Sequence, residues 1–145
     1  MRENEMLVVP RFAEVDMISV VHHSRYWVWF EEAKFHFLES IFGITPQDIA
    51  SSNIYLPVID CKCSYLSSVK WKDRIKIITK MNIDSTSSLE FNHEAYSDNE
   101  ANKRLICRAY VKHAFVDQNF NLKLRIPLLF KNAIDRNKEK SFAFF

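Results

Sequence analysis

The stretch RYWVWFEEAKFHFLESIF, from Arg25 to Phe42, decides the fold. At about 100° per residue, its apolar side chains cover most of the circumference of a helix, and only a narrow stripe is polar. A helix with so little polar surface is usually buried on most sides. The broad apolar face holds Tyr26, Trp27, Phe30, Ala33, Phe37, Leu38 and Ile41, the opposite side holds Val28, Phe35 and Phe42, and the polar stripe holds Glu32, His36 and Glu39.

Residues typical of helix ends flank this segment. Ser24 is the predicted N-cap, because its hydroxyl can accept a hydrogen bond from the first turn. Gly43 follows the last periodic residue, where a left-handed backbone conformation is favoured. Thr45, Pro46 and Asp48 then combine a capping residue, a proline at the first helical position and an acid at the third, which predicts a short second helix.

The rest of the chain is patterned as strands. Alternation of apolar and polar residues is typical of a sheet with one covered face, and it places His93 among core or interface residues. Pro10 makes the first strand an edge or bulged strand, and the tail from Asp135 is either a docking helix or a frayed end. A sheet wrapped around the long helix, an α+β fold, is the economical arrangement. The predicted strands are Met6 to Phe12, Leu56 to Leu66, Arg74 to Ile83, Leu89 to Tyr96, Arg104 to Val116 and a short one around Lys123 to Pro127.

Length and composition narrow the class of protein. The 145 residues fit a single domain spanning 1–145, and a net charge of +2 argues against a dominant nucleic-acid surface. The N-terminus lacks the features of a secretory signal, and no apolar run reaches the roughly 18 residues of a membrane span. The odd cysteine count favours reduced thiols and a cytoplasmic location. Cys61 and Cys63 have no second pair at ligand spacing, so we expect no metal site and interpret both as small core residues.

The residues that carry chemistry lie just before the long helix. Asp16 stands in a loop, and His22 and His23 directly precede the helix. The N-terminus of a helix offers unpaired N–H groups and a partial positive charge. A carboxylate held near such an end can attack a carbonyl carbon or activate water, while the N–H groups stabilise the developing oxyanion. The alternative is an ordinary capping aspartate with two structural histidines.

This segment resembles the opening signature of the hotdog-fold acyl-CoA thioesterases, and it is most similar to the 4-hydroxybenzoyl-CoA thioesterase type. The resemblance implies a hotdog fold, hydrolysis of a thioester of coenzyme A or acyl carrier protein, no cofactor, and a homodimer or homotetramer with sites between subunits. It extends from Met6 to Ala133 through Asp16, Val20 to Tyr26, Trp29 to Ala33, Leu56 to Ile59, Ser64 to Lys70, Lys72 to Ile77, Ala114 to Asp117 and Arg125 to Pro127.

The resemblance also implies roles for individual residues. Asp16 matches the catalytic acid, which acts as nucleophile or as general base. The backbone N–H of His23 matches the donor that polarises the thioester carbonyl, and its side chain orients substrate or water. Tyr26 matches the residue that packs the helix start beside the substrate. Two positions depart from the pattern, because Ser19 stands where glycine is frequent and Ser68 where proline is frequent.

Coenzyme A carries phosphates that need a local cluster of cations. The predicted substrate-binding cations are Lys70, Lys72 and Arg74, and further candidates are Lys103, Arg104 and Arg108.

Two other functions remain open at this point. The first is a hotdog dehydratase or hydratase, which uses a histidine with an acid on the long helix. The second is a non-catalytic acyl-binding module that keeps the fold without turnover, against which an intact Asp16 argues.

Overall fold

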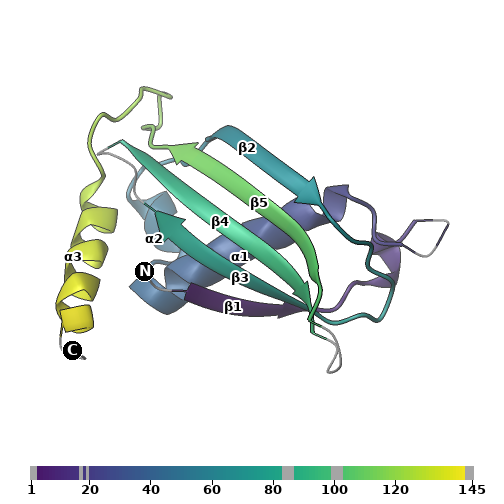
Figure 1. Cartoon of the computed structure of the whole chain (residues 1–145). Helices are drawn as coiled ribbons and strands as arrows, with labels where there is room; N and C mark the ends of the chain where they lie inside the picture. Colours follow the sequence, from purple (N-terminus) through teal and green to yellow (C-terminus); the bar gives the residue numbers. More distant parts are fainter. Residues whose placement is uncertain (1–2, 17, 19, 83–86, 99–102, 143–145) are drawn as a thin grey trace.

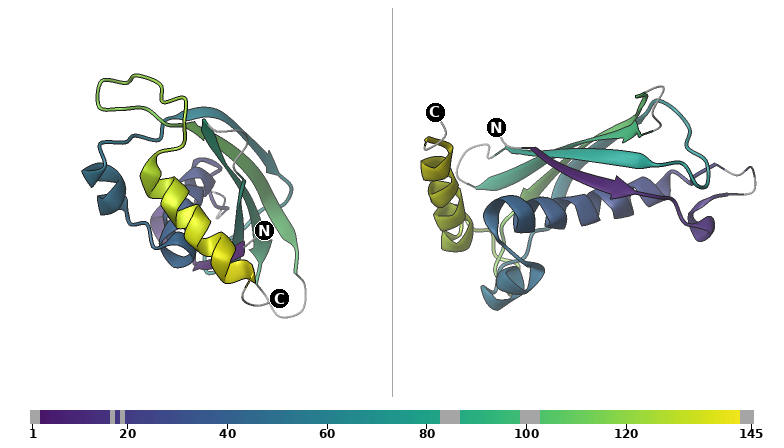
Figure 2. Two further views of the ribbon diagram at one scale, coloured as in Figure 1. Left: turned by 90° about the vertical axis from the view of Figure 1, so that its left-hand side faces the viewer. Right: turned by 90° about the horizontal axis from the view of Figure 1, so that it is seen from below.

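The protein has a sheet on one side and a long helix, α1 (Ser24–Phe42), on the other. The computed structural model describes residues 3–16, 18, 20–82, 87–98 and 103–142. Figure 1 shows α1 lying along one face of the sheet, and Figure 2 shows the sheet curving over it while α3 stands at one end. Among the described residues no helix covers the opposite face of the sheet. The predicted α+β architecture is therefore confirmed.

All neighbouring strands pair antiparallel, in the order β1-β3-β4-β5-β2. The edge positions thus belong to β1 and β2, which precede and follow α1 in the sequence. The alternation predicted for the central strands is confirmed, since every second residue of β3 and β4 is buried against the helix side. The strands are β1 (Glu3–Val8), β2 (Val58–Tyr65), β3 (Ile75–Asn82), β4 (Ser88–Ser97) and β5 (Leu105–Ala114).

The ends of the helices follow the predicted chemistry except at the start of α1. His23 is the N-cap, and the ring nitrogen Nδ1 of His22 accepts from the N–H of Ser24 at 3.2 Å, so the prediction of Ser24 as N-cap is wrong. The second helix is confirmed, with Thr45 Oγ1 accepting from the N–H of Asp48 at 3.1 Å. No described helix is long and apolar enough to cross a membrane. The helices are α1 (Ser24–Phe42), α2 (Pro46–Ser51) and α3 (Leu128–Phe142).

The core has two parts, one under each half of α1. The rings of Phe30 and Phe91 both stack with the His93 ring, and His93 Nδ1 pairs with Thr79 Oγ1 at 2.9 Å. Burial, together with the nearby His113 and Lys34, lowers the pKa of His93 to about 3. His93 is thus a neutral core residue with a satisfied ring nitrogen, as the alternation predicted.

Three local predictions are wrong. The first strand ends at Val8, before Pro10, and residues Phe12–Glu14 form a 3₁₀ turn, because proline offers no N–H to a strand ladder. No strand spans Lys123 to Pro127, where the described backbone makes only a bridge between Leu122 and Val116. The interpretation of Cys61 as a core residue is also wrong, because it is exposed on edge strand β2, while Cys63 is half-buried and Cys107 is buried.

Gly43 provides a test of the backbone at the end of α1. It is left-handed, at φ 68°, and a Cβ atom there would meet nothing within 4 Å. Replacement by alanine therefore probes the backbone conformation alone, and we expect Gly43→Ala to lower the free energy of unfolding by about 1 kcal/mol. Urea unfolding followed by circular dichroism measures this. Ser40→Ala, on the exposed surface of the same helix, is the control and should not destabilise. Equal stability of Gly43→Ala and the parent would contradict this account.

Candidate active site

Hydrogen bonds of Glu14 connect the segment before α1 to the helix itself. Its carboxylate is buried, and Oε2 accepts from the indole Nε1–H of Trp29 at 2.8 Å. Oε1 accepts from the backbone N–H of Arg11 at 2.8 Å and from the Arg11 guanidinium at 3.3 Å. The carbonyl oxygen of Glu14 also accepts from the N–H of His22 at 2.9 Å. One residue thus holds both ends of the Asp16 loop in place.

Asp16 and Val20 are the two ends of the Asp16 loop and are joined through their backbones. The N–H of Asp16 donates to the carbonyl of Val20 at 2.8 Å, and Val15 bridges to Val21 just outside the turn. Asp16 Oδ1 accepts from the N–H groups of Ile18 at 3.0 Å and Val20 at 3.3 Å. Both bonds use the same oxygen, so the second carboxylate oxygen, Oδ2, takes part in neither. Asp16 is exposed, and its carboxylate has a fixed orientation.

The N-terminus of α1 follows this loop directly. The His22 and His23 rings stack at 4.2 Å between centroids, and His22 Nδ1 lies 2.8 Å from Ser24 Oγ. The carbonyl of His23 accepts from the Tyr65 hydroxyl at 3.2 Å. Within the described part of the chain, the backbone N–H of His23 makes no hydrogen bond. A free N–H at a helix N-terminus can bind a carbonyl oxygen on which negative charge develops.

A groove of about 340 Å³ opens beside this helix end. It lies between the segment that enters α1 and the segment that leaves β2, at the end of the molecule away from α3 (Figure 1). We call it the α1 groove. Its lining residues are Val20, Val21, His23, Tyr26, Tyr65, Leu66, Ser67 and Ser68.

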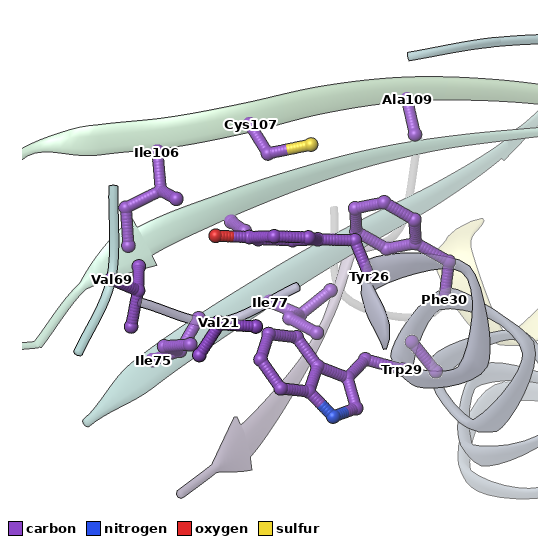
Figure 3. Close-up of a cluster of buried hydrophobic side chains, with 12 residues drawn as sticks. Val21, Tyr26, Trp29, Phe30, Val69, Ile75, Ile77, Ile106, Cys107 and Ala109 are labelled. Atoms are coloured by element: carbon purple, nitrogen blue, oxygen red, sulfur yellow. The ribbon is translucent and has the colours of Figure 1, made fainter. Parts of the chain in front are cut away.

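Two tyrosines form the floor of the α1 groove. In Figure 3 the Tyr26 ring extends beneath Cys107 toward Ile106, whereas the Trp29 indole nitrogen points away from the sheet. The Tyr26 and Tyr65 rings meet edge to face, with centroids 5.4 Å apart. Burial is the main cause that raises the pKa of Tyr26 to about 12, and burial also raises the pKa of Tyr65. Both phenols are therefore neutral donors at physiological pH.

The structure separates the predicted cations. Lys70 adjoins the Asp16 loop, because its backbone bridges to Val20. Lys72 lies over the Trp71 ring, with its ammonium 4.6 Å from the centroid, and Arg74 faces Asp98 at 4.0 Å. Arg104, one of the further candidates, donates to the carbonyl of Ser68 in the groove wall at 3.0 Å.

The site therefore brings together Asp16, His23, Tyr26 and the backbone of Lys70, while Lys72 and Arg74 have partners elsewhere. Ser68 lines the groove, and Ser19 lies outside the described residues. Sequence reasoning missed Glu14 and Tyr65. Tyr65 lies within the stretch Ser64 to Lys70 that carries the resemblance, but nothing in the sequence marked it as a contact of His23.

This chain belongs to the Thioesterase-like superfamily, whose family model matches residues 10–134. Solved structures with a similar fold include the DHNA-CoA thioesterase of Staphylococcus aureus, with a TM-score of 0.83, 22% identity, and coverage of 99% of this chain and 93% of that chain. The 1,4-dihydroxy-2-naphthoyl-CoA thioesterase Slr0204 of Synechocystis has a TM-score of 0.81, 18% identity, and coverage of 92% and 96%. The 4-hydroxybenzoyl-CoA thioesterase of Pseudomonas sp. strain CBS-3 has a TM-score of 0.80, 19% identity, and coverage of 93% and 99%.

The Glu14–Trp29 hydrogen bond can be tested directly. Glu14→Ala leaves the buried indole N–H without an acceptor, so we expect a loss of about 1–3 kcal/mol in the free energy of unfolding. Denaturant unfolding followed by tryptophan fluorescence measures the loss. Arg11→Ala is the control, because the Arg11 side chain is 74% exposed and should contribute little. A Glu14→Ala protein as stable as Arg11→Ala would show that the indole contact does not hold the loop.

Proposed function

We propose that this protein hydrolyses the thioester of an acyl group carried by coenzyme A, or by an acyl carrier protein, to the free acid and thiol. The observation that carries the proposal is the Asp16 carboxylate in the loop before α1, which two backbone N–H groups orient, one of them from Val20 in the wall of the α1 groove. Membership of the Thioesterase-like superfamily and the similarity of the fold to that of three CoA thioesterases support the same reaction.

The reaction needs an oxygen nucleophile and a stabilised oxyanion. Asp16 either bonds to the carbonyl carbon and expels the thiolate, giving an anhydride that water cleaves, or removes a proton from the water that attacks. On both routes negative charge moves onto the carbonyl oxygen. The N–H of His23, aligned with the positive end of α1, is the proposed donor to that oxygen.

The phosphates of the carrier would lie at the rim of the groove. Arg104 is attached to the groove wall through the Ser68 carbonyl, and its charge acts on Tyr26 in the floor. Lys70 bridges to Val20, another lining residue of the groove. We therefore assign phosphate recognition to Arg104 and Lys70, and give Lys72 and Arg74 no part in it.

The hydratase alternative finds less support. Such a site would place a histidine and an acid from the long helix against the substrate. The histidine of α1 is His36, which lies on the exposed stripe with its ring 2.6 Å from the Asn4 side-chain amide. That position is away from the groove and from the Asp16 loop.

We further propose a homodimer formed through β2. Most of β2 is exposed, including Val58, Ile59 and Tyr65, and its outer edge has no strand partner among the described residues. An exposed apolar edge strand is a template for pairing with a second chain. The outer sheet face instead carries ion pairs such as Lys80–Glu3 and Arg108–Glu94, which would be costly to desolvate in a stacked tetramer. The three free thiols suit a reducing, cytoplasmic location.

Asp16→Asn tests the mechanism. The amide cannot attack or accept a proton, so we expect kcat for acyl-CoA hydrolysis to fall on the order of 10²-fold or more with the fold unchanged. Thiol release from a panel of acyl-CoA thioesters measures the rate.

Asp117→Asn is a matched control for this experiment. Asp117 Oδ1 accepts from the N–H groups two and four residues later, and its own N–H donates to the carbonyl of Asn121, as in the Asp16 loop. The Asp117 loop follows β5 and does not line the α1 groove, so its substitution should leave kcat near the parent value. Full activity of Asp16→Asn, or equal losses in both variants, would refute the assigned role. A folded parent protein that turns over no thioester would favour the non-catalytic acyl-binding module.

If the homodimer forms through β2, a charge introduced on β2 should change the oligomeric state, whereas a charge introduced on the other edge strand, β1, should not. Ile59 on β2 and Leu7 on β1 are 56% and 57% exposed. Ile59→Lys should convert a dimer to a monomer, because a charge in a pairing edge must be desolvated, whereas Leu7→Lys should leave the dimer intact. Light scattering after size-exclusion chromatography distinguishes the species. A monomeric parent protein, or dissociation by Leu7→Lys instead, would exclude the β2 interface.

A further inference from the structure

The connection between β5 and α3 exposes several large apolar side chains. Among the described residues, Phe120 (77%), Leu124 (72%) and Leu128 (71%) are three of the five most exposed large apolar residues. Leu122 and Tyr55, whose backbones both bridge to Val116, are 58% and 50% exposed. The connection projects beyond the end of the sheet, at the same end of the molecule as α3 (Figure 1). The name α3 patch is used below for Tyr55, Phe120, Leu122, Leu124 and Leu128.

The backbone that carries the α3 patch is firmly held. Phe130, in the first turn of α3, is buried and packs on Phe115 with ring centroids 5.3 Å apart. The N–H of Lys123 donates to the carbonyl of Phe115 at 2.8 Å. Leu122 and Leu124 are nevertheless exposed while Lys123 between them is half-buried, which inverts the pattern expected of a surface loop. The exposure of these leucines is therefore a feature of the folded chain.

Phe120 is the residue for which folding offers the least reason. Its φ of 61° lies in the left-handed region, which glycine and asparagine adopt far more readily than phenylalanine. Its N–H donates to the carbonyl of Asp117 at 3.0 Å, and its ring stacks on Tyr55 with centroids 5.9 Å apart. Stability alone would favour another residue here. A strained and exposed aromatic side chain indicates a contact outside the chain.

The charges around the α3 patch indicate a negatively charged partner. From Gln118 to Arg136 the sequence has four cations and one acid, a net charge of +3, whereas the whole chain has +2. Arg125 and Lys131 are exposed, and neither forms an ion pair with a described carboxylate. Lys131 follows Leu128 by three residues, so the two side chains are neighbours on the surface of α3.

An anionic lipid surface fits this combination better than a protein does. A second copy related by a twofold axis would set the cationic surface against itself. An acidic protein would need a surface complementary in shape to a projecting loop. A membrane needs no such shape, because its headgroup phosphates attract cations while apolar side chains enter the boundary of the acyl chains.

We propose that the α3 patch binds the surface of an anionic lipid membrane. Phe120 and the three leucines enter the boundary between headgroups and acyl chains, and Arg125 and Lys131 stay among the phosphates. The binding is peripheral and reversible, because so few side chains do not make a stable anchor. The α1 groove lies at the end of the molecule away from α3 and stays open to solvent. The inference does not depend on the thioesterase function.

Co-sedimentation of the full chain with lipid vesicles tests the proposal. One set of vesicles contains phosphatidylcholine alone, and the other contains phosphatidylcholine mixed with phosphatidylglycerol. The partition coefficient should be about tenfold or more higher for the phosphatidylglycerol vesicles. Raising the ionic strength from about 0.1 M to about 1 M shortens the Debye length from about 10 Å to about 3 Å and should weaken this binding.

Two double variants separate the apolar and the charged contributions. Phe120→Asn with Leu124→Gln should lower the partition coefficient about tenfold or more, because both inserted side chains are lost. Arg125→Gln with Lys131→Gln should lower it by a similar factor on phosphatidylglycerol vesicles and little on phosphatidylcholine alone. Leu7→Gln, at a residue of β1 that is 57% exposed, is the control and should bind like the parent.

A stability measurement distinguishes membrane binding from a structural role of Phe120. Asparagine accepts the left-handed backbone, so Phe120→Asn should leave the midpoint of urea unfolding unchanged or raise it while vesicle binding falls. A lowered midpoint would show that the Phe120 ring serves folding, and it would overturn the argument from strain.

The remaining outcomes are equally distinct. No binding to phosphatidylglycerol vesicles, equal binding to both kinds of vesicle, or parent-like binding of Phe120→Asn with Leu124→Gln would overturn the proposal. A loss of molar mass by light scattering in that double variant would assign the patch to a contact between copies of this chain, and would also overturn it. Hydrolysis of soluble acyl-CoA should be unchanged in every variant. Intact vesicle binding by a parent protein that hydrolyses no thioester would overturn the proposed function alone.

Discussion

The hydrogen bond between the Trp29 indole and the Glu14 carboxylate is the contact on which the arrangement of the site depends. A buried carboxylate is costly unless it is fully hydrogen-bonded, and here three N–H groups meet it. The same residue receives the His22 N–H on its carbonyl oxygen. The chain before the Asp16 loop, the chain after it and the second turn of α1 are thus joined at one point. The Asp16 carboxylate takes its position from α1, and α1 takes its own from the sheet.

Much of the fold could be predicted because it depends on local patterns. The apolar circumference of α1, the caps around Gly43 and Thr45, and the alternation in β3, β4 and β5 all hold in the structure. The end of β1 was misplaced although Pro10, which offers no N–H to a strand ladder, marked it. The start of α3 at Leu128 could not be predicted, because it depends on tertiary packing. Glu14 and Lys34 were missed for a related reason. Charged residues are expected at the surface, and only tertiary partners make their burial tolerable.

The site shows the same difference between what local sequence patterns predict and what tertiary contacts determine. Asp16 and His23 belong to one short motif, so a local reading of the sequence could name them together. The cations were harder to choose, because Lys70, Lys72 and Arg74 are neighbours in sequence but face different partners. The Asp117 loop shows that the local hydrogen bonds of such a loop do not by themselves make a site. It repeats the hydrogen bonds of the Asp16 loop, and they lower the pKa of Asp117, yet this loop neither precedes α1 nor lines the α1 groove. Local geometry prepares a carboxylate, and the surrounding fold determines whether it meets a substrate.

The hollow of about 180 Å³ between the middle of α1 and the sheet has two kinds of wall. Phe30 lines it and also belongs to the core, so its replacement would alter the folding of the subunit. Val58 and Cys61 line it from edge strand β2, and both are exposed. β2 is also the edge through which we propose that two copies pair. A substitution along β2 would therefore change the wall of this hollow and the pairing of the subunits together, while the helix and the central strands stay as they are.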